Sequence, residues 1–144
     1  VNPHKAFLGE KDRQQLEVIR TLVRDLNLDV TIVGKPIVRE ADGLAMSSRN
    51  RYLSKSERDS ARALSQALDL ARNQIERGER SAESIRKEIR RIIEKHKDAE
   101  VDYISICDPE SFTEQKKITS RALIALAVRI GKTRLIDNCF IEEI

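Results

Sequence analysis

Two polar clusters carry the residues best suited to chemistry. The first is Gly9-Glu10-Lys11-Asp12, followed by Gln15. A glycine lets the backbone approach a ligand closely, Lys11 supplies a point positive charge, and the start of a helix offers unpaired amides. These features suit a phosphate group, with Asp12 able to bind ribose hydroxyls and Gln15 a polar substrate group. The alternative is an ordinary charged helix start, because an isolated Gly-x-Lys is common.

The second cluster is the stretch "DGLAMSSRN" at residues 42–50. Ser47 and Ser48 offer adjacent hydroxyl donors, and the guanidinium of Arg49 can donate hydrogen bonds to two phosphate oxygens at once. The stretch is polar and longer than an ordinary connection, and such loops often bind ligands. It could therefore wrap a triphosphate. The alternative is a solvent-exposed loop whose serines cap helices.

The elements around the first cluster predict a small piece of an α/β layer. Residues 13–26 have apolar positions at helical spacing, with Asp12 placed as the N-cap. The β-branched run at residues 30–34 ends in glycine and predicts a buried strand. A helix followed by a strand is the rhythm of a parallel sheet, and one such unit is too little for a complete doubly wound sheet. The apolar positions expected to face inward are Leu16, Ile19, Leu22, Val23 and Leu26.

The rest of the chain predicts two helices on a small, mostly antiparallel sheet. Ser54 or Ser56 caps a helix that continues to about residue 77, where Gly78 ends it. Ser81 caps a second helix that continues to about residue 97. Gly131 lies in a hairpin turn between the last two strands. The predicted strands cover residues 101–107, 122–129 and 133–138.

Composition narrows the function classes. The net charge is +3, from 27 Lys and Arg against 24 Asp and Glu, and the two signs are mixed along the helices. With aromatics at 3%, stacking residues for a nucleic acid are almost missing, so no nucleic-acid partner is expected. No apolar run approaches the length of a membrane span, so no membrane partner is expected. Cys107 and Cys139 lie in apolar runs, which predicts buried, reduced thiols and a cytoplasmic protein.

The two clusters closely resemble those of the pantothenate synthetase (pantoate–β-alanine ligase) family. The matching strings are "GEKDRQQL" and "VREADGLAMSSRNRYLS", followed by "VDYISICDPESF" and "ALIALAVRIGKTRLIDN". Together they match the second half of a family member. The resemblance implies an α/β fold: residues 1–45 would be the remnant of a Rossmann-like nucleotidyl-transferase layer. Residues 46–144 would be a small α+β C-terminal lid domain, with two helices on a mostly antiparallel three-stranded sheet.

The family's reaction implies a role for each matching residue. Pantoate attacks ATP to form pantoyl adenylate, with Mg²⁺ present, and β-alanine then displaces AMP. The Val38 backbone would touch adenine and Gln15 would contact pantoate. Lys11, Ser47, Ser48 and Arg49 would be the catalytic groups, because they can stabilise charge on the transferring phosphates. The ATP-contacting residues implied are Gly9, Glu10, Lys11, Asp12, Val38, Met46, Ser47, Ser48 and Arg49.

The resemblance also implies that part of the site is missing. The family's His-x-Gly-His motif does not occur in these 144 residues, whose two histidines are His4 and His96. The chain is therefore expected to be inactive alone, and the full enzyme is expected to be a homodimer. The alternative is an isolated domain that serves as a self-association or binding module, since an uncovered apolar face tends to find a partner.

Overall fold

The computed structural model describes residues 3–142 of the chain. These residues form two compact units, of which the first ends at Val38 and the second begins at Arg39. Residues 39–45 belong to the second unit, where Arg39 forms an ion pair with Asp137 of the last strand. The domain boundary expected between residues 45 and 46 stays a prediction.

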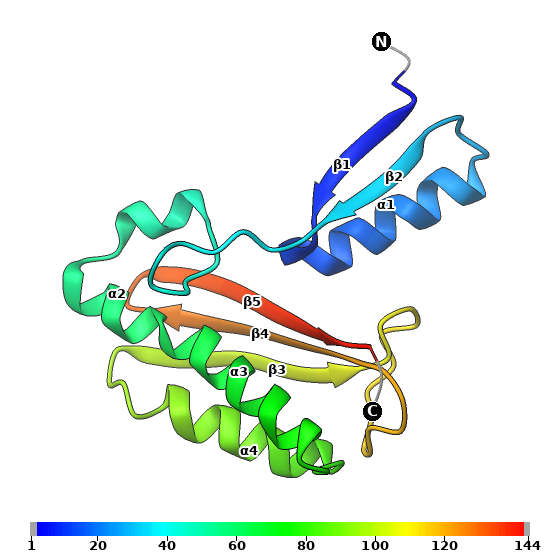
Figure 1. Cartoon of the computed structure of the whole chain (residues 1–144). Coiled ribbons are helices and arrows are strands. Elements are labelled where there is room, and N and C mark those ends of the chain that lie inside the picture. Colours follow the sequence, from blue (N-terminus) through cyan, green and yellow to red (C-terminus); the bar gives the residue numbers. More distant parts are fainter. Residues whose placement is uncertain (1–2, 143–144) are drawn as a thin grey trace. The chain divides into compact units, whose positions relative to one another are not determined.

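The first unit is a βαβ unit with a parallel pair of strands, as Figure 1 shows. Leu16 on the helix is buried, and a Cβ atom added at Gly34 would lie 3.2 Å from its Cδ2. Glycine at this position therefore lets the helix pack closely on the second strand. The first strand was not expected from the sequence. The elements are β1 (Lys5–Gly9), a short 3-10 helix at Glu10–Asp12, α1 (Arg13–Asp25) and β2 (Thr31–Lys35).

Much of the apolar surface of this unit is uncovered among the described residues. Of the five residues of α1 and its end expected to face inward, only Leu16 is fully buried, while Leu22 is 50% and Leu26 61% exposed. Phe7 on β1 is 60% exposed. A two-stranded sheet is too small to cover a helix on its own, so the apolar pattern of α1 is wider than the surface available to bury it.

The second unit is a three-stranded antiparallel sheet in the order β3-β4-β5. Helices α3 and α4 lie side by side on one face of that sheet (Figure 1). Alternate residues of β4 face these helices and belong to one buried cluster, from Ala122 to Ile130. The helical elements are a 3-10 helix at Ser48–Tyr52, α2 (Lys55–Ala61), α3 (Ala63–Glu76) and α4 (Ala82–Ile93). The strands are β3 (Ala99–Cys107), β4 (Ala122–Ile130) and β5 (Thr133–Ile141).

Local signals determine where these elements begin and end. Ser54 forms a capping box with Glu57 at the start of α2, and the Ser81 side chain caps α4. Gly78 adopts a φ of 101° after α3, and Gly131 a φ of 54° in the hairpin between β4 and β5. Both positive values suit glycine. The helices and strands of this unit therefore begin close to the positions that the sequence predicts.

Several boundaries differ from the prediction, among them the start of β3, at Ala99 rather than residue 101. The helix expected to run from residue 54 to 77 is interrupted at Arg62, between α2 and α3. Helix α4 ends at Ile93 rather than near residue 97, and β5 continues to Ile141 rather than 138. The longer strand follows from its pairing with the whole of β4, which the composition of its last residues does not reveal.

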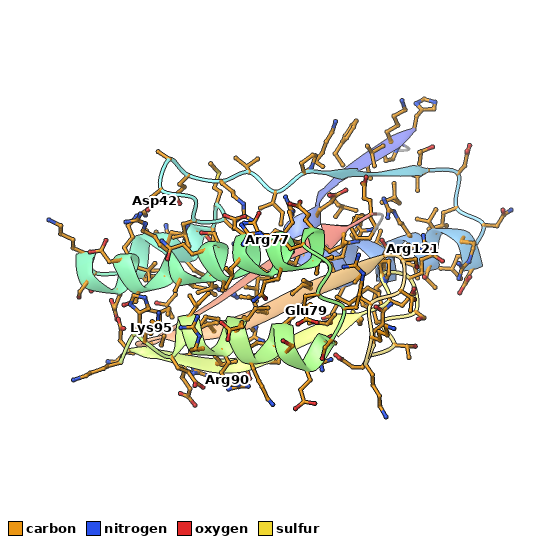
Figure 2. The ribbon with its side chains drawn as sticks, turned by 60° about the horizontal axis from the view of Figure 1, so that its bottom comes forward. Asp42, Arg77, Glu79, Arg90, Lys95 and Arg121 are labelled. Atoms are coloured by element: carbon orange, nitrogen blue, oxygen red, sulfur yellow. The ribbon has the colours of Figure 1, made fainter. Side chains whose placement is uncertain are left out.

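The remaining composition-based predictions concern thiols and surface. Cys107 and Cys139 are both buried and free, as predicted, and burial raises the pKa of Cys139 to about 12. Three exposed basic residues of α4 form ion pairs along the helix, Lys87 with Glu83, Arg90 with Glu94 and Arg91 with Glu88. Arg90 is labelled in Figure 2. Within residues 3–142, none of the helices has the length and apolar character that crossing a membrane requires.

Candidate functional site

The first cluster lies at the carboxyl edge of the parallel pair. Gly9 is the last residue of β1 and pairs in register with Lys35, the last residue of β2. Ligands of open α/β layers bind outside the carboxyl ends of their strands, where the next helix also presents its free amides. A Cβ atom added at Gly9 would meet no atom within 4 Å. The packing of the described residues therefore does not demand glycine here, and the space beside it is open to a ligand.

The side chains of this cluster point in different directions. Asp12 occupies the N-cap position of α1 as expected, but its side chain makes no capping hydrogen bond, which corrects that part of the prediction. The Glu10 carboxylate lies toward α1 and β2, 3.8 Å from the Arg13 guanidinium. Gln15 is exposed in the first turn of α1, and Lys11 is half-buried beside it. The exposed Asp12 and Gln15 can both reach a ligand at the strand edge.

Val38 closes the first unit. It follows β2 by three residues and its side chain is 60% exposed. This placement is compatible with the backbone role implied by the resemblance, and it stays a prediction.

The second cluster begins as a tight hairpin in the second unit. Arg39 and Ala45 bridge in antiparallel fashion, and the Glu40 amide donates to the Leu44 carbonyl at 2.8 Å. Gly43 closes the turn with a φ of 89°, a conformation that a side chain disfavours. Leu44 and Ala45 are buried, at 3% and 2% exposure. The long polar stretch predicted to be loop-like therefore has a fixed, anchored beginning, the 39–45 hairpin.

The four residues that follow, residues 46–49, are here called the donor segment; Met46, Ser48 and Arg49 are exposed, and Ser47 is half-buried. The Ser47 hydroxyl accepts a hydrogen bond from the Arg49 amide at 3.2 Å, which turns the chain into a 3-10 helix. Arg49 donates from its guanidinium to the Arg134 carbonyl on β5 at 3.4 Å. Asn50, directly after the segment, is buried. The exposed Ser48 and Arg49 and the half-buried Ser47 thus lie between two buried residues, Ala45 and Asn50.

An ion pair with a buried partner ties the hairpin to the sheet. Arg39 donates to both oxygens of Asp137 on β5, at 2.7 and 3.1 Å, and to the Gly43 carbonyl at 3.1 Å. The Asp137 side chain is 2% exposed. The hydrogen bonds to Asp137 raise the pKa of Arg39 above its ordinary value, so the guanidinium stays charged. This contact fixes the start of the second cluster on the sheet.

Replacing Asp137 by asparagine is expected to destabilise the second unit by about 2 kcal/mol, because the half-buried Arg39 loses its charged partner. Urea unfolding of the chain measures the change. Asp102→Asn is the matched control, since Asp102 also pairs with an arginine but is 44% exposed. We expect about 0.5 kcal/mol or less for that variant. An Asp137→Asn variant as stable as the control would show that the pair does not anchor the hairpin.

Sequence reasoning missed the residues that hold the donor segment. Asp137 follows Arg39 by 98 positions, and Arg58 follows Glu40 by 18. No spacing rule connects such distant partners, although the charges of residues 39–42 on a short hairpin hint that they need partners. Within residues 3–142, no group of three or more His, Cys, Asp or Glu side chains could hold a metal ion.

Comparisons with known proteins indicate the family to which the chain belongs. A family model described as pantoate-beta-alanine ligase matches residues 1–140. Pantothenate synthetases from Caldicellulosiruptor saccharolyticus and Geotalea uraniireducens are 53% and 54% identical to the chain over 142 and 143 residues. Each alignment includes 99% of this chain, but 50% and 51% of the respective relative. The chain thus spans about half the length of the curated relatives it matches.

Solved structures agree. The crystal structure of pantothenate synthetase from Thermus thermophilus matches with a TM-score of 0.89 at 40% identity, covering 94% of this chain and 49% of that one. A pantoate-beta-alanine ligase from Francisella tularensis, solved with Beta-gamma ATP and Beta-alanine, matches with a TM-score of 0.61 at 30% identity. The α/β architecture, with its three-stranded antiparallel sheet, therefore matches that of about half of a solved pantothenate synthetase. The chain belongs to the pantoate–β-alanine ligase family.

Proposed function

We propose that this chain supplies part of the ATP-binding site of a ligase that condenses pantoate with β-alanine. The observation that carries the proposal is the donor segment, in which the exposed Ser48 and Arg49 and the half-buried Ser47 lie between buried anchors within a family match that covers residues 1–140. Such a set of neutral and charged donors suits phosphate oxygens. The Francisella relative was solved with an ATP compound and β-alanine, which supports the same substrates here.

In the first step, a carboxylate oxygen of pantoate attacks the α-phosphorus of ATP. A new oxygen–phosphorus bond forms, the bond to the bridging oxygen breaks, and pyrophosphate leaves. Negative charge increases on the phosphate oxygens during this exchange. We assign the stabilisation of that charge to Lys11 and to Ser47, Ser48 and Arg49 of the donor segment, because fixed donors aimed at developing charge are the strongest form of catalysis available to such groups.

Binding roles are assigned to the remaining residues of the two clusters. Gly9, Glu10 and Asp12 contact ATP at the edge of the parallel strands, with Asp12 toward the ribose. The backbone of Val38 contacts adenine, Met46 lies against the nucleotide, and Gln15 contacts pantoate from the first turn of α1. In the second step the amine of β-alanine attacks the acyl carbon of pantoyl adenylate, AMP leaves with the bonding electrons, and the nitrogen loses a proton.

Mg²⁺ is the ion that the family's chemistry implies. The described residues offer no three-ligand cluster, so they do not fit a metal site built from this chain's side chains alone. Mg²⁺ in nucleotide sites is commonly held by substrate phosphates with one or two carboxylates. The residues present fit that arrangement only, with the nucleotide bringing the ion and the donor segment acting on the remaining phosphate oxygens.

The proposal includes dependence on a second segment. The first unit resembles one βαβ repeat of a Rossmann-like layer, and its exposed Phe7, Leu22 and Leu26 need a covering partner. The chain covers half of its relatives and contains no His-x-Gly-His. We infer that it is inactive alone, that the complete enzyme is a cytoplasmic homodimer, and that its substrates are small molecules. The second candidate is a self-association module, which the same exposed apolar residues favour.

The test is a hybrid ligase, in which these 144 residues replace the matching half of the Caldicellulosiruptor saccharolyticus relative. We expect pantoate-dependent release of pyrophosphate from ATP, followed by β-alanine-dependent formation of pantothenate. The intact relative is the positive control, and the hybrid without pantoate is the blank. A folded hybrid that binds neither ATP nor pantoate would refute the proposed function.

A further inference from the structure

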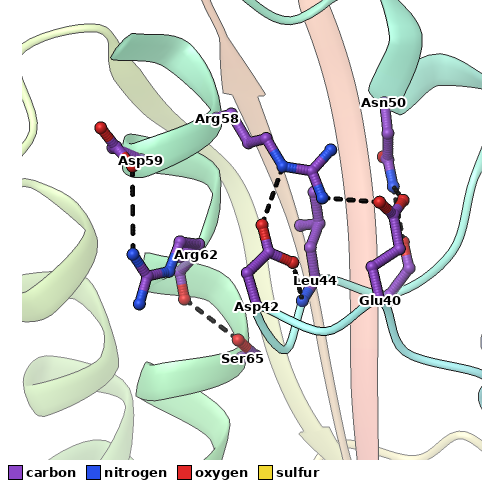
Figure 3. A network of polar contacts seen from close by, with 9 residues as sticks. Glu40, Asp42, Leu44, Asn50, Arg58, Asp59, Arg62 and Ser65 are labelled. Atoms are coloured by element: carbon purple, nitrogen blue, oxygen red, sulfur yellow. Dashed lines mark hydrogen bonds and ion pairs between the residues drawn. The ribbon is translucent and has the colours of Figure 1, made fainter. Parts of the chain in front are cut away.

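We propose that Arg58 on α2 is a positioning residue that holds the donor segment in its working conformation through Glu40 and Asp42. This inference rests on the proposed function, since it concerns how the same loop is kept ready for ATP. Arg58 does not belong to either polar cluster of the sequence. It lies nine residues beyond Arg49, and its guanidinium returns to the 39–45 hairpin (Figure 3).

The contacts form a continuous chain from the helix to both ends of the donor segment. Arg58 donates from Nε to Asp42 at 2.8 Å and from Nη2 to Glu40 at 2.6 Å. The other oxygen of Glu40 accepts from the Asn50 amide group at 2.5 Å. Asn50 also donates to the Ala45 carbonyl at 3.2 Å. Glu40 therefore links the residue after the segment to α2, while Ala45 is the residue directly before it.

Asp42 fixes the turn of the hairpin from within. One of its oxygens accepts from the Leu44 amide at 3.3 Å while the other accepts from Arg58. The hydrogen bond from Arg58 lowers the pKa of Asp42, and those from Asn50 and Arg58 lower the pKa of Glu40. Both carboxylates therefore stay charged at neutral pH, and the two negative charges share one guanidinium. Without Arg58 they would repel each other across the turn.

The geometry requires an arginine rather than any cation. The planar guanidinium directs Nε and Nη2 to two different carboxylates at the same time, which a single ammonium on a flexible stem cannot reproduce. Arg58 is about one-third exposed, so isolated ion pairs there would contribute little to overall stability. The network instead selects one loop conformation, and a misplacement of about 1 Å at a reacting group can cost about 10²-fold in rate.

The first test measures the loop itself in the 144-residue chain by hydrogen–deuterium exchange. We expect Arg58→Gln to speed exchange of the backbone amides in residues 44–50 by about fivefold or more, because they lose a fixed framework. Arg58→Lys should fall between the variant and the wild type. Arg91→Gln is the matched control, since Arg91 also donates two hydrogen bonds to a carboxylate, but on α4. In the Arg91→Gln variant, the amides of residues 44–50 should exchange within about twofold of the wild-type rate.

The second test measures the hybrid ligase. We expect Arg58→Gln to lower kcat/KM for ATP in pyrophosphate release by about tenfold, with KM for pantoate changed by about twofold or less. A general loss of stability would affect both substrates alike. If Arg58→Gln does not fold, Glu40→Gln breaks the same link from the hairpin side and is measured in its place.

The outcomes separate the two proposals. Wild-type exchange rates in Arg58→Gln would overturn the positioning role, whatever the activity. Faster exchange with unchanged kcat/KM for ATP in an active hybrid would also overturn it, because the loop conformation would then not matter for ATP. An inactive wild-type hybrid would count against the proposed function, and the exchange measurement would still decide whether Arg58 holds the loop.

Discussion

Replacing Ser47 and Ser48 together by alanine in the hybrid ligase is expected to lower the rate of pantoyl-adenylate formation by about 10²-fold or more. The reason is that both hydroxyls are donors assigned to the transferring phosphates, where charge grows in the transition state. The Michaelis constant for pantoate should change by about threefold or less, since Gln15 in the other unit is assigned to that substrate. Single-turnover formation of the adenylate, with enzyme in excess over ATP, isolates the step.

The controls separate chemistry from loop structure. Ser47 also caps the 3-10 helix through the Arg49 amide, so part of its effect is structural. Ser47→Thr and Ser48→Thr keep the hydroxyls and should recover most of the rate. Ser56→Ala removes an exposed hydroxyl on the neighbouring helix and should leave the rate unchanged. An adenylation rate in the double alanine variant equal to that of Ser56→Ala would remove the donor segment from the mechanism.

Replacing Lys11 by methionine is expected to lower kcat/KM for ATP in the hybrid by about 10²-fold. The reason is that the carboxyl edge of the parallel strands would lose a positive charge that stabilises the negative phosphates. Lys11→Arg keeps the charge with a different shape and should recover part of the activity. Steady-state pyrophosphate release at varied ATP measures both. The effect should appear mainly with ATP, while the response to β-alanine stays unchanged.

The matched control for Lys11 lies on the same unit. Lys5 is at the opposite end of β1, paired in register with Thr31 at the amino edge of the strands. Lys5→Met removes one positive charge without approaching the carboxyl edge, so kcat/KM for ATP should stay within about twofold of the wild type. Equal losses from Lys5→Met and Lys11→Met would mean that overall charge, rather than a placed cation, explains the result.

Features of the fold that depend on neighbours in sequence could be predicted. Ser54, Ser81 and the glycines at 78 and 131 act on the adjacent turn, so their spacing reveals the helix starts, the helix end and the hairpin. Strand β1 could not be found in this way. It has five residues and its partner β2 begins only at Thr31, after a whole helix. Parallel pairing of this kind is decided by contacts distant in sequence.

In the candidate site, too, local features could be predicted from the sequence and contacts between distant residues could not. The types and order of Gly9, Lys11, Ser48 and Arg49 indicate phosphate chemistry directly, because each residue carries its own functional group. What holds these groups is not visible in the spacing. The partner of Arg39 lies on β5, and the capping role expected of the Asp12 side chain is absent although the residue occupies the cap position. Side-chain partners across the fold are set by packing, which a local pattern does not encode.

The central claim is that these 144 residues are one necessary part of a split active site. Its most direct test measures pantoate-dependent pyrophosphate release from ATP in three samples. The first is this chain, the second is the half of the Caldicellulosiruptor saccharolyticus relative that this chain does not match, expressed separately, and the third is a mixture of the two. We expect background rates from each part alone and a rate well above their sum from the mixture, abolished by omitting pantoate. Full activity from the 144-residue chain alone, or no gain on mixing two folded parts that bind each other, would contradict the claim.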